Sequence, residues 1–384
     1  MGLSDVLARS ASRHAHALVV EVPGSWRARM TAERNLFARG WRLADSPADA
    51  DVLVVCGAPG PGLAEAIESV WHQMPGPRVR VDVHAGDEVG ARLDEAHRGL
   101  LDTDHHRRDA QQRPTASELL AEQAEPEAES HGGHEGMDHG GHDGMDHGGH
   151  EGHDDMEMSP GGIPLAEGGE DRDGLEMDVL QVRFGPVLPH WPAGLVLRCS
   201  LQGDVIVEAQ AELVDGAARQ EDDVIGPARG IDNIASLLAL TGWDDAAAEA
   251  RRIRDTALEP GDGAAGSDLE RLRRRVRRSW TLRWSLRGVR RLSDEGAHAR
   301  GLPADAVGDT YDRLIGMLDR AVAGVAATAA GDTGRTNVAD RTLSTDHLAP
   351  LVTGLDLATA RLVLASLDVH ELVAGQAEHE VSHG

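Results

Sequence analysis

The middle of the chain constrains the fold most. Residues 118–178 contain 19 Asp or Glu residues and one basic residue, Arg172. The wider stretch 103–178 has almost no β-branched or aromatic side chains and is rich in Gly, Asp, Glu and His. Such a segment cannot bury enough apolar surface to offset the conformational entropy lost on ordering. The sequence therefore predicts a disordered linker over 103–176 between two domains, at 1–102 and 177–384.

Charge and cysteine content limit the partners that the two domains can have. The net charge is −27, but the acidic segment supplies −18 of it and leaves about −9 for the rest of the 384 residues. This balance argues against nucleic acid as a partner. Cys56 and Cys199 form no CxxC pair, and no long apolar run or signal peptide is present. We expect a cytoplasmic protein, at most associated with a membrane through a complex.

The first domain alternates apolar strands with helix-like segments. Apolar runs predict strands at 17–24, 51–57 and 78–83, and helical spacing predicts helices at 25–41, 62–74 and 88–100. The run DVLVVCG is continuously apolar, as expected for a strand covered on both faces. The series predicts an α/β domain with a parallel, flavodoxin-like sheet.

The second domain begins with strand patterns and continues with helical ones. Alternating runs at 177–185, 195–203 and 204–213 predict an antiparallel hairpin sheet. After Gly230 the helical segments are 234–242, 244–258, 271–291, 309–328 and 355–375. The expected fold class of this domain is α+β, with a small antiparallel sheet and a helical bundle.

The run ADVLVVCGAPGPGLAEAIESVWHQMPGPR in the first domain resembles the cluster-bearing small subunit of respiratory complex I and of membrane-bound nickel-iron hydrogenases. The resemblance places one cluster cysteine of that family on Gly86. It places two earlier adjacent cysteines just after the first strand, where this chain has VEVPGSW. Cys56 is not at a ligand position. Because a cluster needs about four thiolate ligands, no iron-sulfur cluster is expected.

Three runs of the second domain resemble the large subunit of the same families. They are GPVLPHWPAGLVLRCSLQGDVIVEA, GDTYDRLIGML and VTGLDLATARLVLASLD. The resemblance places a histidine pair, which helps to line the quinone pocket in complex I, on Leu188 and Pro192. The loss of this pair argues against a working quinone site; the alternative is that His190, close by in the same loop, partly substitutes for it. The metal-binding cysteines of the hydrogenases are replaced by VHEL at 369–372. The resemblance implies a scaffold that has lost its ligands.

The linker carries three octads, HGGHEGMD, HGGHDGMD and HGGHEGHD, over residues 131–154. Imidazoles suit zinc, nickel and copper(II), and thioethers suit copper(I). The Gly-Gly pairs let the chain fold back so that two rings reach one ion. The alternative is an acidic spacer with incidental histidines. The candidate metal ligands for nickel, copper or zinc are His131, His134, His139, His142, His147, His150, His153, Met137 and Met145.

Three further motifs have competing interpretations. Residues 271–291 contain ten Arg, with Trp280 and Trp284 four residues apart; on one helix both tryptophans would pack against the bundle beside Leu272 and Val276. The arginines would then dock an acidic partner, an anionic membrane surface or the acidic linker, or simply face solvent. The segment GAPGPG is expected to form a turn and not a phosphate loop. The two histidines His105 and His106 are either part of the metal-binding set or exposed to solvent.

These observations lead to three hypotheses. The favoured one is a fused, degenerate relative of both subunits, acting as a non-catalytic or accessory subunit of an NADH-quinone oxidoreductase-like or hydrogenase-like complex. Its partners would be the other subunits of that complex. The second is a metal-handling protein that stores or delivers metal through the octads. The third is an active oxidoreductase subunit, which is ranked lower because the ligand residues are missing.

Overall fold

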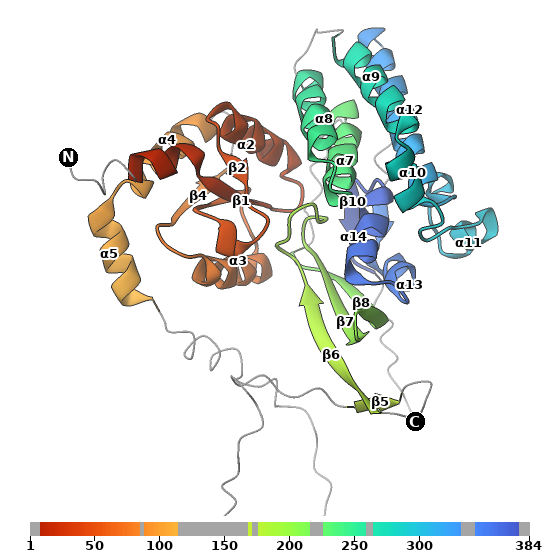
Figure 1. Ribbon diagram of the computed structural model, residues 1–384, viewed down its shortest axis with the longest axis horizontal. Coiled ribbons are helices and arrows are strands. Elements are labelled where there is room, and N and C mark those ends of the chain that lie inside the picture. Colours follow the sequence, from red (N-terminus) through yellow and green to blue (C-terminus); the bar gives the residue numbers. More distant parts are fainter. Residues whose placement is uncertain are drawn as a thin grey trace, which may run out of the picture.

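The computed structural model describes residues 8–84, 88–113, 168–170, 176–215, 226–258, 264–331 and 342–375. It contains an α/β domain at the N-terminal end and an α+β domain at the C-terminal end, as the sequence predicts (Figure 1). Among the described helices, none is long and apolar enough to cross a membrane.

The N-terminal domain is a parallel four-stranded sheet with the order β2-β1-β3-β4. Its strands are β1 (His16–Glu21), β2 (Arg42–Leu43), β3 (Val52–Cys56) and β4 (Val79–Val83). The helices are α2 (Trp26–Ala38), α3 (Pro61–Gln73), α4 (Val89–Leu100) and α5 (Thr103–Gln112). One core lies between the sheet and α2 and α4, and a second lies between the sheet and α3. Helices on both faces explain why every residue of β3 is buried.

Two parts of this domain differ from the prediction. The short edge strand β2 has no apolar run of its own and pairs with only two residues of β1. The prediction of a disordered linker over 103–176 is wrong for residues 103–112, which form α5, and for residues 168–170, which form a short strand. The Asp102 side chain accepts a hydrogen bond from the backbone nitrogen of His105 at the start of this helix. Arg78 holds its far end by an ion pair with Asp109 at 3.1 Å.

The C-terminal domain begins with an antiparallel sheet. Strands β6 (Glu176–Phe184), β7 (Leu195–Gln202) and β8 (Val205–Leu213) form consecutive pairs, and β5 (Gly168–Glu170) pairs with β6. The inward side of β7 packs on α13 (Ala349–Val352) and α14 (Leu357–Ser366). Strands β9 (Thr342–Ser344) and β10 (Glu371–Val373) form a small parallel pair that the sequence pattern did not predict.

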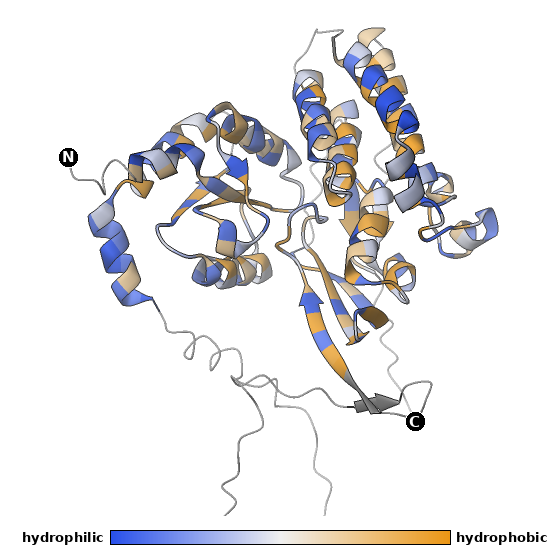
Figure 2. Ribbon diagram, viewed as in Figure 1, coloured by the Kyte–Doolittle hydropathy of each residue, from blue (hydrophilic) through white to orange (hydrophobic). Residues whose placement is uncertain are grey.

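The helices of this domain pack into a bundle with its own core. They are α7 (Pro227–Leu240), α8 (Asp244–Ala257), α9 (Ala264–Arg278), α10 (Trp280–Leu286) and α12 (Thr310–Ala329), with the short α11 (Asp294–Ala299) beside them. Apolar residues of these helices face inward, and the outer faces of α8 and α9 are hydrophilic (Figure 2).

The expected packing of the two tryptophans on the bundle is wrong. Trp280 and Trp284 are 74% and 72% exposed, whereas Leu272 and Val276 are buried. The helix ends at Arg278, and Ser279 has an extended ψ of 106°. The hydroxyl of Ser279 caps a new helix whose phase buries Leu282 and Leu286 instead. If residues 271–291 formed one continuous helix, Trp280 and Trp284 would face the bundle. The break at Ser279 turns them toward solvent instead.

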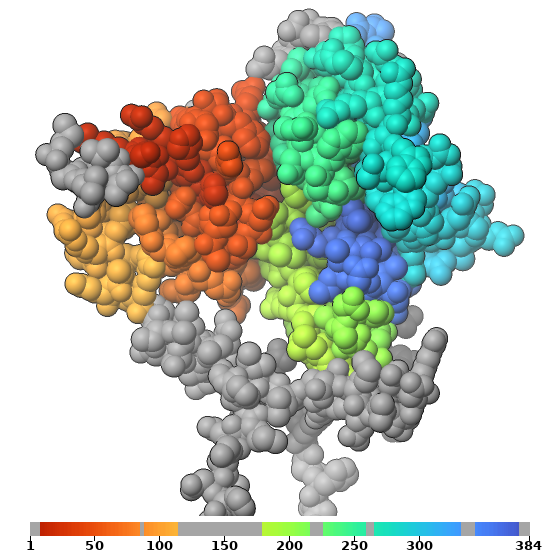
Figure 3. All heavy atoms as spheres, viewed as in Figure 1, coloured from red at the N-terminus to blue at the C-terminus, as the bar shows by residue number. Residues whose placement is uncertain are grey.

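The two domains lie against each other along one side of the N-terminal lobe (Figure 3). Helix α2 contacts α8, and the loop after β8 reaches α3. This junction between segments more than 150 residues apart in the chain contains the candidate site.

Candidate functional site

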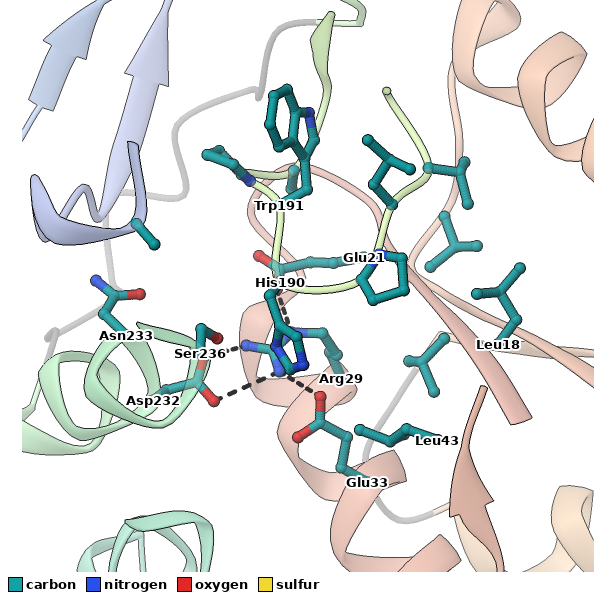
Figure 4. Close-up of a pocket in the computed structure, with 18 of the residues that line it drawn as sticks. Leu18, Glu21, Arg29, Glu33, Leu43, His190, Trp191, Asp232, Asn233 and Ser236 are labelled. Atoms are coloured by element: carbon teal, nitrogen blue, oxygen red, sulfur yellow. Dashed lines mark hydrogen bonds and ion pairs between the residues drawn. The ribbon is translucent and has the colours of Figure 1, made fainter. Parts of the chain in front are cut away.

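A cavity of about 130 Å³ opens at the junction of the two domains (Figure 4). Its walls come from β1 and α2 of the N-terminal domain and from α7, α8 and the loop between β6 and β7 of the C-terminal domain. Residues that line it include Leu18, Val20, Glu21, Arg29, Glu33, Leu188, His190, Pro192, Asp232, Asn233, Ser236 and Arg251. Its size is similar to that of a cavity that holds one benzene molecule.

A network of buried ion pairs crosses the junction beside this cavity. Arg29 of α2 pairs with Glu21, with Glu33 at 2.5 Å, and with Asp232 of α7. Arg254 of α8 pairs with Glu33 at 2.5 Å and with Asp232 at 2.7 Å. Each domain therefore supplies both charges, and each carboxylate is shared by guanidinium groups from both domains. Figure 4 shows Arg29 between Asp232 and Glu33.

Two more pairs extend the network at its edges. Arg229 of α7 lies 3.5 Å from Glu21 and 3.8 Å from Asp232. Arg254 also holds Asp255 at 2.8 Å. These pairs satisfy charges that would otherwise be costly to remove from water.

The pKa values of the network follow from opposing causes. Burial would raise the pKa of Asp232, but attraction to Arg29 and Arg254 outweighs it and holds the pKa below its usual value. The pKa of Glu33 is lowered in the same way against the effect of burial. Burial would lower the pKa of Arg254, but Glu33 and Asp232 raise it. These shifts keep Glu33, Asp232 and Arg254 charged at neutral pH.

His190 lies on the cavity wall in the loop between β6 and β7. Its φ is +56°, a left-handed conformation that histidine tolerates better than most residues. The loop is held by Trp191 Nε1, which donates to the Leu195 carbonyl at 2.7 Å, and by Arg361 Nη2, which donates to the Pro189 carbonyl at 2.7 Å. Burial, and next the charge of Arg251, lower the pKa of His190 to about 4. The imidazole is therefore neutral at physiological pH.

This pKa predicts a pH dependence of stability. The folded-state pKa of His190 is depressed to about 4 from an ordinary value of 6.5. Below pH 6.5 the unfolded chain binds a proton that the folded chain does not, so stability present above pH 6.5 is lost as the pH falls toward 4. The loss attributable to this group is at most about 3 kcal/mol. His190→Asn, which keeps a side chain suited to positive φ, should flatten the profile of melting temperature in this range.

The matched control for this measurement is His298→Asn, at an exposed position of α11. The depressed carboxylates of the network lose their contribution at lower pH, below their ordinary values near 4, which separates the two effects. Identical pH profiles for the intact chain and His190→Asn would contradict the assignment to His190.

Positions at which the resemblance places ligands of the small subunit and of the large subunit line the same cavity. Leu188 and Pro192, where the family's histidine pair would lie, both line the cavity. Glu21, in the VEVPGSW segment where adjacent cysteines would lie, lines it from the opposite domain. Apolar side chains and an ion-paired carboxylate thus stand at the places of the expected ligands. Gly86 lies outside the described residues.

The two cysteines do not fit the ligand set of an iron-sulfur cluster. Cys56 is fully buried in β3, and Cys199 is buried in β7 of the other domain. Burial raises the pKa of both thiols, which disfavours the thiolate form that binds iron. The described residues therefore offer no cysteine cluster at the junction.

The GAPGPG turn leads into α3, as expected, and the protein's own carboxylate occupies the start of that helix. Asp215, after β8, accepts hydrogen bonds from the backbone nitrogens of Gly62 at 3.3 Å and Leu63 at 2.6 Å. A Cβ at Gly60 would lie 2.5 Å from Asp215 Cγ. A helix N-terminus attracts anions, and here the anion is supplied by the second domain.

The predicted metal ligands of the octads lie outside the described residues. His105 and His106 lie on α5 with ring centroids 5.5 Å apart. Within the described part of the chain, no group of three or more His, Cys, Asp or Glu side chains is arranged to hold a metal ion. The metal hypothesis remains a prediction about the linker.

The ion network was missed by sequence reasoning. The signal available was weak: Arg29 and Glu33 are four residues apart on one helix, as are many solvated pairs. Their partners are 203 and 221 residues away in sequence. A run of apolar residues on both sides of these charged residues would have indicated that they are buried.

The chain was compared with known proteins. No protein-family model matches the sequence, and no curated protein matches it. Among solved structures, a chain of "the membrane-bound sulfane sulfur reductase (MBS), an archaeal respiratory membrane complex" is similar, with a TM-score of 0.36 and 12% sequence identity. The similarity covers 50% of this chain and 96% of that chain. At this level two chains need not share a fold.

Proposed function

We propose that this protein is an accessory, non-catalytic component of a complex I-like or hydrogenase-like assembly, in which small-subunit-like and large-subunit-like domains are fused. The observation that carries the proposal is the ion network at the domain junction. One member, Glu21, lies in the segment where the resemblance places two cluster cysteines, and the network adjoins the cavity that Leu188 and Pro192 line. The paired charges join the two domains across this cavity.

Three features support a scaffold role. The carboxylates at the junction are held charged by guanidinium groups, so they are poor proton donors or acceptors near neutral pH. His190 is neutral and half-buried. The helix start at α3 is occupied by Asp215. A rigid two-domain body is what a structural subunit must offer to its neighbours.

Purification of the complex from the native source under mild conditions tests the proposal. We expect this chain to be recovered in stoichiometric amount with the membrane subunits of the assembly. The isolated chain, treated with iron and sulfide, should develop no iron-sulfur absorption band. Recovery of the chain alone would contradict the accessory role, and a stable cluster would contradict the loss of redox chemistry.

A second candidate function is metal handling by the octads. The specific observation in its favour is the three near-identical His-rich octads at 131–154, two of which also contain Met. If this segment is disordered, as its composition predicts, metal binding carries the added cost of ordering the chain, so moderate affinity is expected.

Calorimetric titration tests this function directly. The intact chain is expected to bind nickel, copper(II) or zinc in excess of a variant that lacks residues 131–158. The control is a deletion of residues 114–130, which leaves the octads and α5, with His105 and His106, in place. Equal metal binding by the intact chain and the octad deletion would remove the case for metal handling.

A further inference from the structure

The most exposed aromatic residues of the described chain are Trp280 and Trp284 on α10. Their rings stack with centroids 6.5 Å apart and planes 19° apart, and both side chains project from the surface. The other five tryptophans are buried or half-buried. Large exposed apolar side chains of this kind mark interaction sites.

Four exposed arginines lie close to the tryptophan pair along the chain. They are Arg274 and Arg278 at the end of α9 and Arg283 and Arg287 on or just after α10. Within the described residues, no carboxylate lies within ion-pair distance of any of these four.

Other arginines of α9 behave differently. Arg273 and Arg277 pair with Asp319 of α12, at 2.8 Å in each case. Arg275 pairs with Glu249 of α8, also at 2.8 Å. Carboxylates of neighbouring helices therefore pair with Arg273, Arg275 and Arg277, whereas Arg274 and Arg278 of the same helix have no carboxylate partner among the described residues.

A shallow hollow of about 560 Å³ lies at the end of α9 and reaches Ser279, the residue before Trp280. It is lined by Trp243, Arg271, Arg274, Arg275, Arg278 and Ser279. Arg275 also stacks over the Trp243 ring at 4.8 Å. Guanidinium groups bind phosphate oxygens in a bidentate manner, so this hollow has the chemistry for an anionic headgroup.

We propose that this tryptophan-arginine surface (Trp280, Trp284, Arg274, Arg278, Arg283 and Arg287) docks on an anionic phospholipid bilayer. Tryptophan favours the headgroup region, because its ring is apolar and its N–H remains hydrated there. The rings protrude and can enter a fluid interface, whereas a protein partner would need a matching pocket. The arginines lie where they can contact lipid phosphates.

The charge of the whole chain does not prevent this contact. The net charge of −27 repels an anionic surface, but at physiological salt electrostatic effects decay within about 8 Å. The local excess of arginine therefore dominates close to the bilayer. Binding should weaken as salt is raised. The inference does not depend on the proposed function, because it concerns direct contact between this chain and lipid.

Vesicle flotation with the full-length chain tests the proposal. Vesicles of pure phosphatidylcholine are compared with vesicles containing about one third phosphatidylglycerol. We expect the chain to float with the anionic vesicles and to remain in solution with the neutral ones. Tryptophan emission should shift to shorter wavelength on binding, and acrylamide should quench it less, because the two exposed rings become shielded.

Two variants assign binding to this surface. Trp280→Ala with Trp284→Ala should abolish the emission shift. Replacement of the four arginines by Gln should weaken partitioning about 100-fold or more, at about fivefold for each charge. The matched control changes four exposed arginines elsewhere to Gln: Arg42, Arg98, Arg108 and Arg252. It removes the same charge and should keep most of the binding. Circular dichroism confirms that each variant is folded.

Several outcomes would overturn the proposal. One is failure of the intact chain to bind anionic vesicles, which would leave an acidic protein surface as the partner. Another is equal loss of binding in the control variant, which would show a general charge effect. Equal binding to neutral and anionic vesicles would show that the arginines do not contribute.

Discussion

Arg254→Met is expected to lower the free energy of unfolding by about 3–5 kcal/mol. The Arg254 side chain is fully buried and pairs with Glu33 at 2.5 Å and Asp232 at 2.7 Å. Methionine fills a similar volume but removes a positive charge that pairs with both Glu33 and Asp232 in a buried region. The cost comes mainly from the uncompensated buried charges and not from the loss of a favourable pair.

Urea unfolding, followed by circular dichroism and tryptophan fluorescence, measures this effect. The control is Arg80→Met in the N-terminal domain, which removes partly exposed pairs with Glu68 and Asp82 and should cost at most about 1 kcal/mol. Combining Arg254→Met with Glu33→Leu should recover part of the loss, because one orphaned carboxylate is removed as well. A cost for Arg254→Met no larger than that of the control would show that the network does not hold the domains together.

Arg313→Met is expected to destabilise the C-terminal domain by about 3 kcal/mol. Arg313 is 1% exposed, and its guanidinium holds the segment that precedes α12. Its Nε donates to Ser366 Oγ at 2.8 Å, and its Nη1 donates to the Gly308 carbonyl at 2.8 Å and the Arg290 carbonyl at 3.2 Å. Burial lowers the pKa of Arg313 to about 10, and the charges of Asp309 and Asp312 offset the effect of burial only in part.

Thermal unfolding of three variants separates the contributions at this position. Arg313→Lys keeps the charge but loses the planar fork, so its melting temperature should lie between those of the intact chain and Arg313→Met. The control is Arg274→Met on exposed α9, which should change stability by less than about 0.5 kcal/mol. If Arg313→Met and Arg274→Met had the same melting temperature, the bonds of Arg313 would not contribute to stability.

Arg313 also shows what the Gly-Asp-x-Tyr-x-Arg resemblance means in this chain. Gly308 adopts a φ of +93°, and Asp309 and Asp312 form a capping box at the start of α12. The arginine then ties that start to Ser366 and to the loop before it. The aspartate and the arginine of this motif thus both stabilise the start of α12.

Much of the fold could be predicted from local pattern. The alternation of apolar runs with helical spacing gave the parallel sheet and its helices, because each strand covered on both faces must be apolar along its length. Period-two alternation gave β6, β7 and β8 in the same way. The strands β2, β9 and β10 were missed because a strand of two or three residues is too short to show the alternation of apolar and polar side chains. The extent of α5 was missed because its stability comes from Asp102 and Arg78.

Sequence by itself determined the fold class, the division by an acidic linker, and the lack of a cysteine set for a cluster. These properties follow from composition and from spacing within a few turns of chain. Tertiary structure alone decided which charges are buried and which tryptophans are exposed. The network joins residues more than 200 positions apart, and a single break at Ser279 turns Trp280 and Trp284 outward. A charge or an aromatic ring has no fixed environment until the elements that surround it have packed.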